Sequence, residues 1–206
     1  HGHMDHIGGL DKIQEATNSV VRCHPLLRSS LAKLLGNDDI VSPLEDHEKI
    51  PLPGGSAIQA LYTPGHSSDH ICYHFPEDRV MFTGDTVLGA SSTSVQDLRS
   101  YLKSLELLTK YDHEIIGPGH GPVVPAPRGS NYIKKQIEHR QAREDQIISV
   151  LQEGLLSIPE ITNAIYPKRI LTSLRSSAER NVGAHLDKLV EDRRVNKELS
   201  SFTLRI

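Results

Sequence analysis

The sequence repeats one pattern three times: a short apolar strand ends at a glycine turn, and a histidine or an aspartate follows the glycine. The predicted strands cover residues 57–63, 79–83 and 114–117, and the polar residues behind them are His66, Asp85 and His120. In α/β folds, ligand sites gather at strand ends. Glycine frees the backbone to place each side chain there. The pattern predicts a sheet whose strand ends present one shared polar pocket.

Hydrophobic periodicity predicts the remaining elements. We expect further strands over 20–23 and 71–75, helices over 10–21, 25–36 and 95–110, and turns through the proline- and glycine-rich stretch 37–56. A proline-rich break follows at 122–129. Beyond it the sequence predicts a long charged helix over 131–153, shorter helices over 157–166 and 177–192, and a hairpin over 193–206. This order is the plan of a winged helix-turn-helix, so two domains are expected, 1–127 and 128–206.

The first six residues, His-Gly-His-Met-Asp-His, concentrate potential metal ligands. His1 and His3 can converge on one ion from a short extended turn, and Asp5 and His6 can face a second ion. Imidazole nitrogen and carboxylate oxygen suit Zn²⁺, and also Mn²⁺ or Fe²⁺. An expression-tag remnant would also explain His-Gly-His-Met, but the residues that follow continue the motif without a break. The later ligands of a binuclear site would be His66, His120 and, as a natural bridge, Asp85.

These motifs resemble the metallo-β-lactamase superfamily in its two-metal hydrolase form. The matching segments are HGHMDH, then TPGH at 63–66, FTGD at 82–85 and PGHG at 118–121. The resemblance implies one metal held by His1, His3 and His66, a second held by Asp5, His6 and His120, and Asp85 bridging them. It also implies an α/β fold, the αββα sandwich of the family, with a C-terminal winged-helix-like domain. Family members carry strands before the first histidine, so the sandwich is expected to be N-terminally incomplete here.

The resemblance further implies a reaction. Two zinc ions per chain would share a bridging hydroxide that attacks a carbonyl carbon or a phosphorus, and Asp5, the expected catalytic residue, would hold it or relay its proton. The chain is also similar to the endoribonuclease-type subgroup of lactamase-beta-like protein 2, in the segments YTPGHSSDH and YIKKQIEHRQAREDQII. This resemblance implies single-stranded RNA as the substrate. Glyoxalase II and fungal acyl-carrier thioesterases share the layout, so a thioester is the alternative. An inactive metal-binding chain and a non-catalytic nucleic-acid module are further alternatives.

Candidate substrate contacts lie on the predicted helix 131–153: Lys134, Lys135, His139 and Arg140. A solvated basic face and, for His139, a purely structural role are the alternatives. The winged-helix-like region could recognise nucleic acid, or it could pack against the catalytic domain or form a homodimer. Three histidines without a motif role are expected at the surface or the core edge, namely His70, His74 and His113.

Composition narrows the remaining classes. The net charge is −3, whereas a dedicated duplex-binding protein is usually basic. No apolar run approaches the ~20 residues that span a bilayer, so no membrane partner is expected. Cys23 and Cys72 are too few for a disulfide framework, and Cys72 is expected to be a small core residue. A reducing, intracellular compartment is therefore expected, and the resemblance to the subgroup implies a mitochondrial location as well as a cytoplasmic one.

Overall fold

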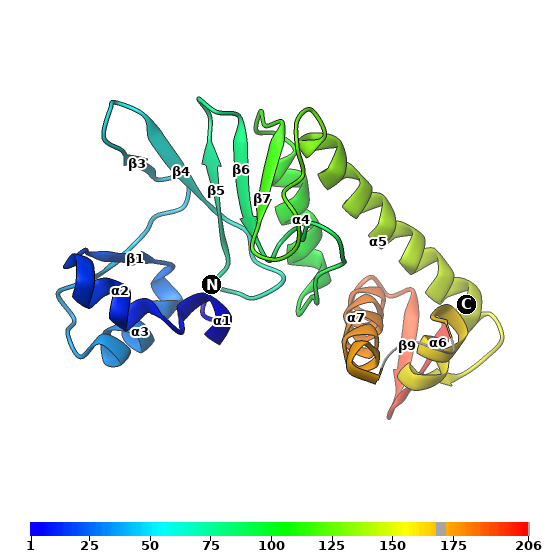
Figure 1. The fold of residues 1–206 in the computed structure, drawn as a ribbon. Coiled ribbons are helices and arrows are strands. Elements are labelled where there is room, and N and C mark those ends of the chain that lie inside the picture. The colour runs from blue at the N-terminus through cyan, green and yellow to red at the C-terminus, as the bar shows by residue number, and fades with distance from the viewer. Residues whose placement is uncertain (168–171, 206) are drawn as a thin grey trace.

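The computed structural model describes residues 1–167 and 172–205 (Figure 1). Its centre is a five-stranded sheet with the order β3-β4-β5-β6-β7. The strands are β3 (Lys49–Pro51), β4 (Ala57–Tyr62), β5 (Ile71–Phe75), β6 (Val80–Gly84) and β7 (Ile115–Pro118). Neighbours are antiparallel except β6 and β7, which are parallel. The strands predicted over 57–63, 71–75, 79–83 and 114–117 are thus confirmed to within a residue or two.

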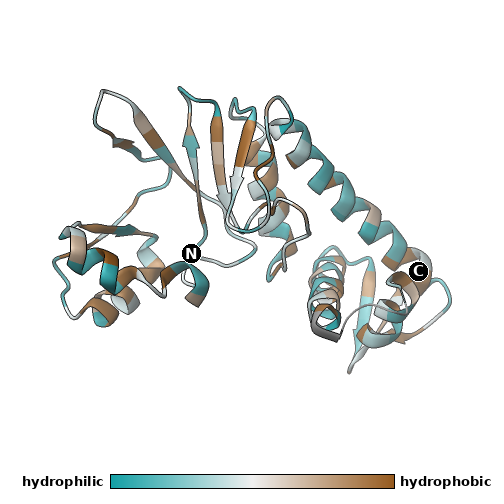
Figure 2. Ribbon diagram, in the orientation of Figure 1, coloured by the Kyte–Doolittle hydropathy of each residue, from teal (hydrophilic) through white to brown (hydrophobic). Residues whose placement is uncertain are grey.

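Helix α4 (Leu98–Leu108) covers one face of this sheet, as its leucine spacing predicted. Leu105 and Leu108 are fully buried against the sheet residues Leu61 and Met81. The side chain of Asp97 accepts a hydrogen bond from the backbone N–H of Ser100 and so caps the first turn, which explains why the helix begins at 98 and not at 95. Figure 2 shows hydrophobic residues on the strands and largely hydrophilic ones along α5.

The N-terminal segment differs from its prediction in three places. Residues 4–7 form a one-turn helix, α1 (Met4–Ile7), where no helix was expected. Helix α2 (Leu10–Thr17) stops early because Asn18 adopts a left-handed conformation, with φ of 50°. The stretch 37–56 contains β3 and β2 (Val41–Pro43), and β2 pairs in parallel with β1 (Val21–Cys23). A 3₁₀ turn (Pro25–Leu27) and α3 (Arg28–Leu35) lie between these two strands.

The C-terminal unit comprises α5 (Gly129–Leu151), β8 (Leu156–Ser157), α6 (Ile158–Ile165), α7 (Thr172–Glu191), β9 (Val195–Glu198) and β10 (Ser201–Leu204). Strands β8, β10 and β9 form a small sheet in that order, which confirms the predicted hairpin; Ile206, its last predicted residue, lies outside the described residues. Helix α5 contributes Ile133 to the core of the large sheet, and Ile147 and Leu151 to the core of the C-terminal unit. The domain boundary at 127/128 remains a prediction. No described helix is both long and apolar enough to cross a bilayer.

Candidate metal centre

The direction of the strands brings the predicted ligands to one edge of the sheet. Strands β4, β6 and β7 all run the same way, so the segments that follow their carboxyl ends meet there. Gly65 turns the chain after β4 with φ of +138°, and a Cβ at this position would lie 2.4 Å from Cα of Tyr101. Gly84 has φ of +46°, a conformation that other residues rarely adopt. His66 and Asp85 each follow one of these glycines.

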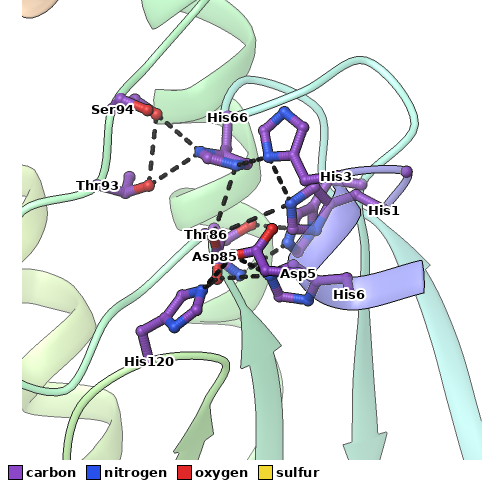
Figure 3. A network of polar contacts seen from close by, with 12 residues as sticks. His1, His3, Asp5, His6, His66, Asp85, Thr86, Thr93, Ser94 and His120 are labelled. Carbon is purple, nitrogen blue, oxygen red and sulfur yellow. Dashed lines mark hydrogen bonds and ion pairs between the residues drawn. The ribbon is translucent and has the colours of Figure 1, made fainter. Parts of the chain in front are cut away.

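The N-terminal segment approaches the same edge from the other side (Figure 3). His3 is extended, with φ of −69° and ψ of 147°, and α1 then carries Asp5 and His6. Asp69 holds this segment in place, because its Oδ2 accepts a hydrogen bond of 2.7 Å from the backbone N–H of Gly2. The loop between β4 and β5 therefore positions the first ligands as well as His66.

Four side chains form the first group of potential ligands: His1, His3, His66 and Asp85. Nδ1 of His3 lies 2.9 Å from Nε2 of His1 and 3.1 Å from Nε2 of His66. Oδ2 of Asp85 lies 3.6 Å from Nε2 of His66. The side chains of His1 and His66 are 1% and 5% exposed, so this group is closed to solvent on its inner side.

The second group consists of Asp5, His6 and His120. Oδ2 of Asp5 lies 3.0 Å from Nε2 of His120 and 3.8 Å from Nε2 of His6. The other oxygen of Asp85, Oδ1, lies 3.4 Å from His6 and 3.6 Å from His120. The side chains of Asp5 and His120 are 57% and 49% exposed, so this group faces solvent. The structure thus brings together all seven residues of the predicted ligand set, which we call the metal-ligand cluster.

The cluster fits two divalent cations. A tetrahedral ion with bonds of about 2.0–2.1 Å spaces its ligand atoms roughly 3.3 Å apart, close to the distances observed here. Oδ1 of Asp85 is buried and has no hydrogen-bond partner among the described residues. A buried carboxylate oxygen in that condition is costly unless a cation neutralises it. The donor set, five imidazoles and two carboxylates, is one that transition metals prefer.

Protonation in the cluster suits metal binding. Burial lowers the pKa of His66, so its ring is neutral at pH 7 and keeps a free lone pair. Its Nδ1 lies 2.8 Å from the carbonyl oxygen of Ser94, which can only accept, so Nδ1 carries the proton and Nε2 faces the cluster. A hydrogen bond with its own backbone N–H lowers the pKa of Asp5, which is a carboxylate at neutral pH.

His70 belongs to the support of the cluster, and sequence reasoning missed it. It is 1% exposed, and its Nε2 accepts a hydrogen bond of 3.0 Å from the backbone N–H of Asp85. The expectation that His70, His74 and His113 lie at the surface or core edge is wrong, because all three are buried. The ring of His74 bonds to the carbonyl oxygen of Asp112 and the ring of His113 to that of Tyr111. Nε2 of His113 has no hydrogen-bond partner among the described residues. No local signal marks His70, because its contact with Asp85 depends on how the β4–β5 loop folds over the end of β6.

The candidate substrate contacts on α5 do not form one face. Lys134, Lys135 and His139 are exposed, whereas Arg140 is 3% exposed and donates a hydrogen bond of 2.8 Å to the carbonyl oxygen of Thr93. Arg140 turns inward because its guanidinium also lies over the Tyr101 ring, 5.1 Å from the centroid. The backbone N–H of Gly129 bonds to Glu114, just before β7, so α5 begins at the end of the sheet opposite the cluster. A role of these four residues in substrate binding remains a prediction.

Comparison with known families identifies the fold. The family model of the Metallo-beta-lactamase superfamily matches residues 1–120, and that of the Beta-lactamase associated winged helix domain matches residues 157–201. This chain belongs to the metallo-β-lactamase superfamily. The predicted superfamily fold and the predicted winged-helix region are thereby confirmed.

Curated relatives point to two subgroups. The chain is 32% identical to a Beta-lactamase-like protein 2 homolog of Caenorhabditis elegans, over 93% of this chain and 63% of the relative. It is 34% identical to the Atrochrysone carboxyl ACP thioesterase of Aspergillus fumigatus, over 74% of this chain and 45% of that protein. The chain therefore spans about half to two-thirds of the length of these relatives.

Solved structures support the same fold. A beta-lactamase domain protein from Burkholderia ambifaria superposes with a TM-score of 0.72 at 20% identity, covering 87% of this chain and 61% of that one. A metallo-beta-lactamase family protein from Thermus thermophilus gives 0.66 at 25% identity, covering 79% and 54%. The chemotaxis sensor ODP, described as a peroxy diiron species, gives 0.51 at 16% identity, covering 64% and 65%.

Proposed function

We propose that this chain is a binuclear metal-dependent hydrolase that uses two zinc ions. The observation that carries the proposal is Asp85, whose two oxygens face the two ligand groups separately, Oδ2 toward His66 and Oδ1 toward His6 and His120. A carboxylate in that position can bridge two ions. We assign His1, His3 and His66 to the first ion, and Asp5, His6 and His120 to the second.

Two ions held there would lower the pKa of a coordinated water and would neutralise negative charge that develops on the substrate. The chain's own residues would direct the reaction. The side of His1 and His66 is closed, so substrate enters from the exposed side of Asp5 and His120. Asp5, a carboxylate at neutral pH, is the group placed to orient the attacking water and to accept its proton. Burial lowers the pKa of His66, so its neutral ring would serve as a ligand.

Single-stranded RNA is the substrate that we favour. Similarity to Beta-lactamase-like protein 2 homologs over 93% of the chain supports this class, since the sequence resembles an endoribonuclease-type subgroup. Exposed Lys134 and Lys135 lie six and five residues before Arg140, which is about 8–9 Å along the helix axis. They could bind a phosphate backbone that runs from the cluster along α5. A thioester is the second candidate, favoured by the likeness to the A. fumigatus thioesterase.

Metal content and substrate should be tested on one preparation. Elemental analysis must quantify zinc and iron together, because a neighbour of the same fold is described as diiron. Labelled single-stranded RNA and a generic acyl thioester are then offered to the wild-type chain and to Asp5→Asn. The matched control is Asp11→Asn, an exposed acid on α2 outside the cluster. We expect two zinc ions per chain and RNA cleavage that Asp5→Asn alone removes.

Each other result has a defined meaning. Thioester cleavage with intact RNA would replace the favoured substrate by the second candidate. Two iron ions would change the metal and keep the ligand assignment. A purified chain that takes up no divalent metal, even when metal is added, would overturn the proposed function.

A further inference from the structure

We propose that two residues of the C-terminal unit, Asn181 and Arg140, position the His66 ring and thereby tune the first ion. The inference rests on the proposed metal site and deepens it. It assigns to the winged-helix region a task within its own chain, through a segment that neither contains a ligand nor shows a sequence motif. The contacts run from α5 and α7 to residues 93–95, and from there to His66.

The first step is the orientation of His66. Its Nδ1 lies 2.8 Å from the carbonyl oxygen of Ser94 and 3.0 Å from Oγ1 of Thr93 (Figure 3). These two acceptors fix the ring plane and keep the proton on Nδ1. Nε2 is then the only ring atom that can donate a lone pair to an ion. Partners of this kind orient a ligand histidine and set its basicity.

The second step is what holds the carbonyl of Ser94. The side-chain amide of Asn181, on α7, bonds to both peptide groups that flank residue Ser94, one of which contains this carbonyl. Its Oδ1 accepts a hydrogen bond of 3.1 Å from the backbone N–H of Val95, and its Nδ2 donates one of 3.4 Å to the carbonyl oxygen of Thr93. Arg140, on α5, donates a further bond of 2.8 Å to that oxygen. Asn181 and Arg140 are 7% and 3% exposed, so water does not compete for these bonds.

The third step is that the face of α7 bearing Asn181 packs against other parts of the same chain. In order along the chain, α7 is the third helix of the unit, the place of the recognition helix in helix-turn-helix proteins. Here the face of α7 that bears Asn181 and His185 points inward, and both residues are buried. Arg99, on α4, pairs with Glu191 and Asp192 at the end of α7. The helix is thus docked on the catalytic unit at two places.

The second ligand group receives no such support from the C-terminal unit among the described residues. Asp5 and His6 stand on α1, and His120 follows β7. Loss of the contact to residues 93–95 should therefore weaken one ion selectively. Removal of such an outer partner typically costs 10- to 100-fold in metal affinity. We expect about tenfold, because Ser94 remains in place as one acceptor.

The experiment measures zinc binding alone, without substrate, by competition with a chromophoric chelator on the whole chain. The variants are Asn181→Leu, Arg140→Met and the nearly isosteric Thr93→Val, with Thr93→Ser as the conservative rescue. Arg99→Met is the matched control, since it removes a contact between the two units that does not reach His66. Nitrogen-resolved NMR of the imidazoles reports the His66 tautomer in the metal-free protein.

We expect the first three variants to weaken one of the two zinc constants about tenfold, and Thr93→Ser and Arg99→Met to leave both unchanged. Asn181→Leu combined with Arg140→Met should lose less than the product of the single losses, because both act through one peptide. Zinc-binding constants equal to those of wild type in the first three variants would overturn this inference and leave the proposed function intact. The same conclusion would follow if both constants weakened equally and Arg99→Met had the same effect. A wild-type chain that binds no zinc would instead overturn the proposed function beneath it.

Discussion

Two buried carboxylates divide this molecule into regions with different chemistry. Glu144, on α5, is 4% exposed, and each of its oxygens has a resident cation: Oε2 lies 2.9 Å from Nζ of Lys188, and Oε1 lies 3.1 Å from Nη1 of Arg194. Asp85 is 7% exposed, and its close partners among the described residues are imidazole rings; its Oδ1 has no hydrogen bond there. One acid is paired with lysine and arginine, and the other is not.

The difference shows how a buried acid reveals its role. A carboxylate taken out of water must be paired, hydrogen-bonded or bound to a metal. Glu144 meets this condition within the fold and joins α5, α7 and the segment before β9. Oδ1 of Asp85 has no such partner among the described residues, and imidazole, the side chain beside it, is a common metal ligand. The buried acid of the C-terminal unit is therefore paired within the fold, whereas the sheet edge is built for ions that the chain does not supply.

The largest effect is expected from Asp85→Asn. We expect loss of at least one ion and a fall in hydrolysis of more than about 100-fold, since even outer partners of a ligand cost 10- to 100-fold. Without metal the variant should melt at the same temperature as wild type, or about 2–4 °C higher, because a buried charge without a partner is removed. Zinc content and thermal melts with and without a chelator measure both effects.

The comparison would break if Asp85→Asn destabilised the metal-free chain by several kcal/mol. That result would mean that the histidines already neutralise Asp85 as cations, and that the carboxylate is a structural group like Glu144. Full retention of two zinc ions would likewise remove Asp85 from its bridging position.

The second effect concerns stability alone. Glu144→Ala leaves Lys188 and Arg194 without their common partner, and we expect a loss of about 2 kcal/mol in the free energy of unfolding, below the usual cost of breaking a buried pair because both cations can reach solvent. Two zinc ions should still bind. Urea unfolding measures the loss. Glu179→Ala, which breaks the partly exposed pair with Arg175, is the control and should cost less than about 1 kcal/mol.

Sequence predicted which seven residues gather in the cluster, because its signals are local. A strand, a glycine and a histidine lie next to one another in the chain, and parallel strand ends bring such units together. The support of that set was not predictable, because it depends on contacts between distant segments. Arg140 has the sequence context of a solvated helix face, and only the packing of α5 on Thr93 and Tyr101 turns it inward. His70 resembles a loop residue until the β4–β5 loop folds over the end of β6.

The third effect separates two buried histidines at the two ends of β5. His70→Leu removes the acceptor for the backbone N–H of Asp85, and we expect about a tenfold loss of zinc affinity. His74→Leu is the control, because His74 is also buried but bonds to Asp112, at the end of the sheet away from the cluster. It should lower stability and leave zinc affinity unchanged. Equal effects of the two variants on zinc would mean that general packing, not the position of Asp85, controls the site.

The smallest effect tests whether the charges of the C-terminal unit are self-contained. Hydrogen bonds from Lys188 and then Arg99 lower the pKa of Asp192 below its ordinary value of 3.8. A lowered pKa gives stability that is present above the unfolded pKa and is lost as the pH falls through the folded one. Asp192→Asn should therefore cost less than about 1 kcal/mol at neutral pH, since the pair is partly exposed. The loss of stability should persist down to about pH 5 and shrink below about pH 4. Urea unfolding of the variant and of the wild type, at each pH, measures it.

The control is Asp187→Asn, at an exposed neighbour without an ion pair among the described residues. This variant should show no loss of stability at any pH. If zinc removed or enlarged the loss of stability in Asp192→Asn, the coupling between the two regions would extend from Asn181 to the charges at the end of α7, and these charges would not be self-contained.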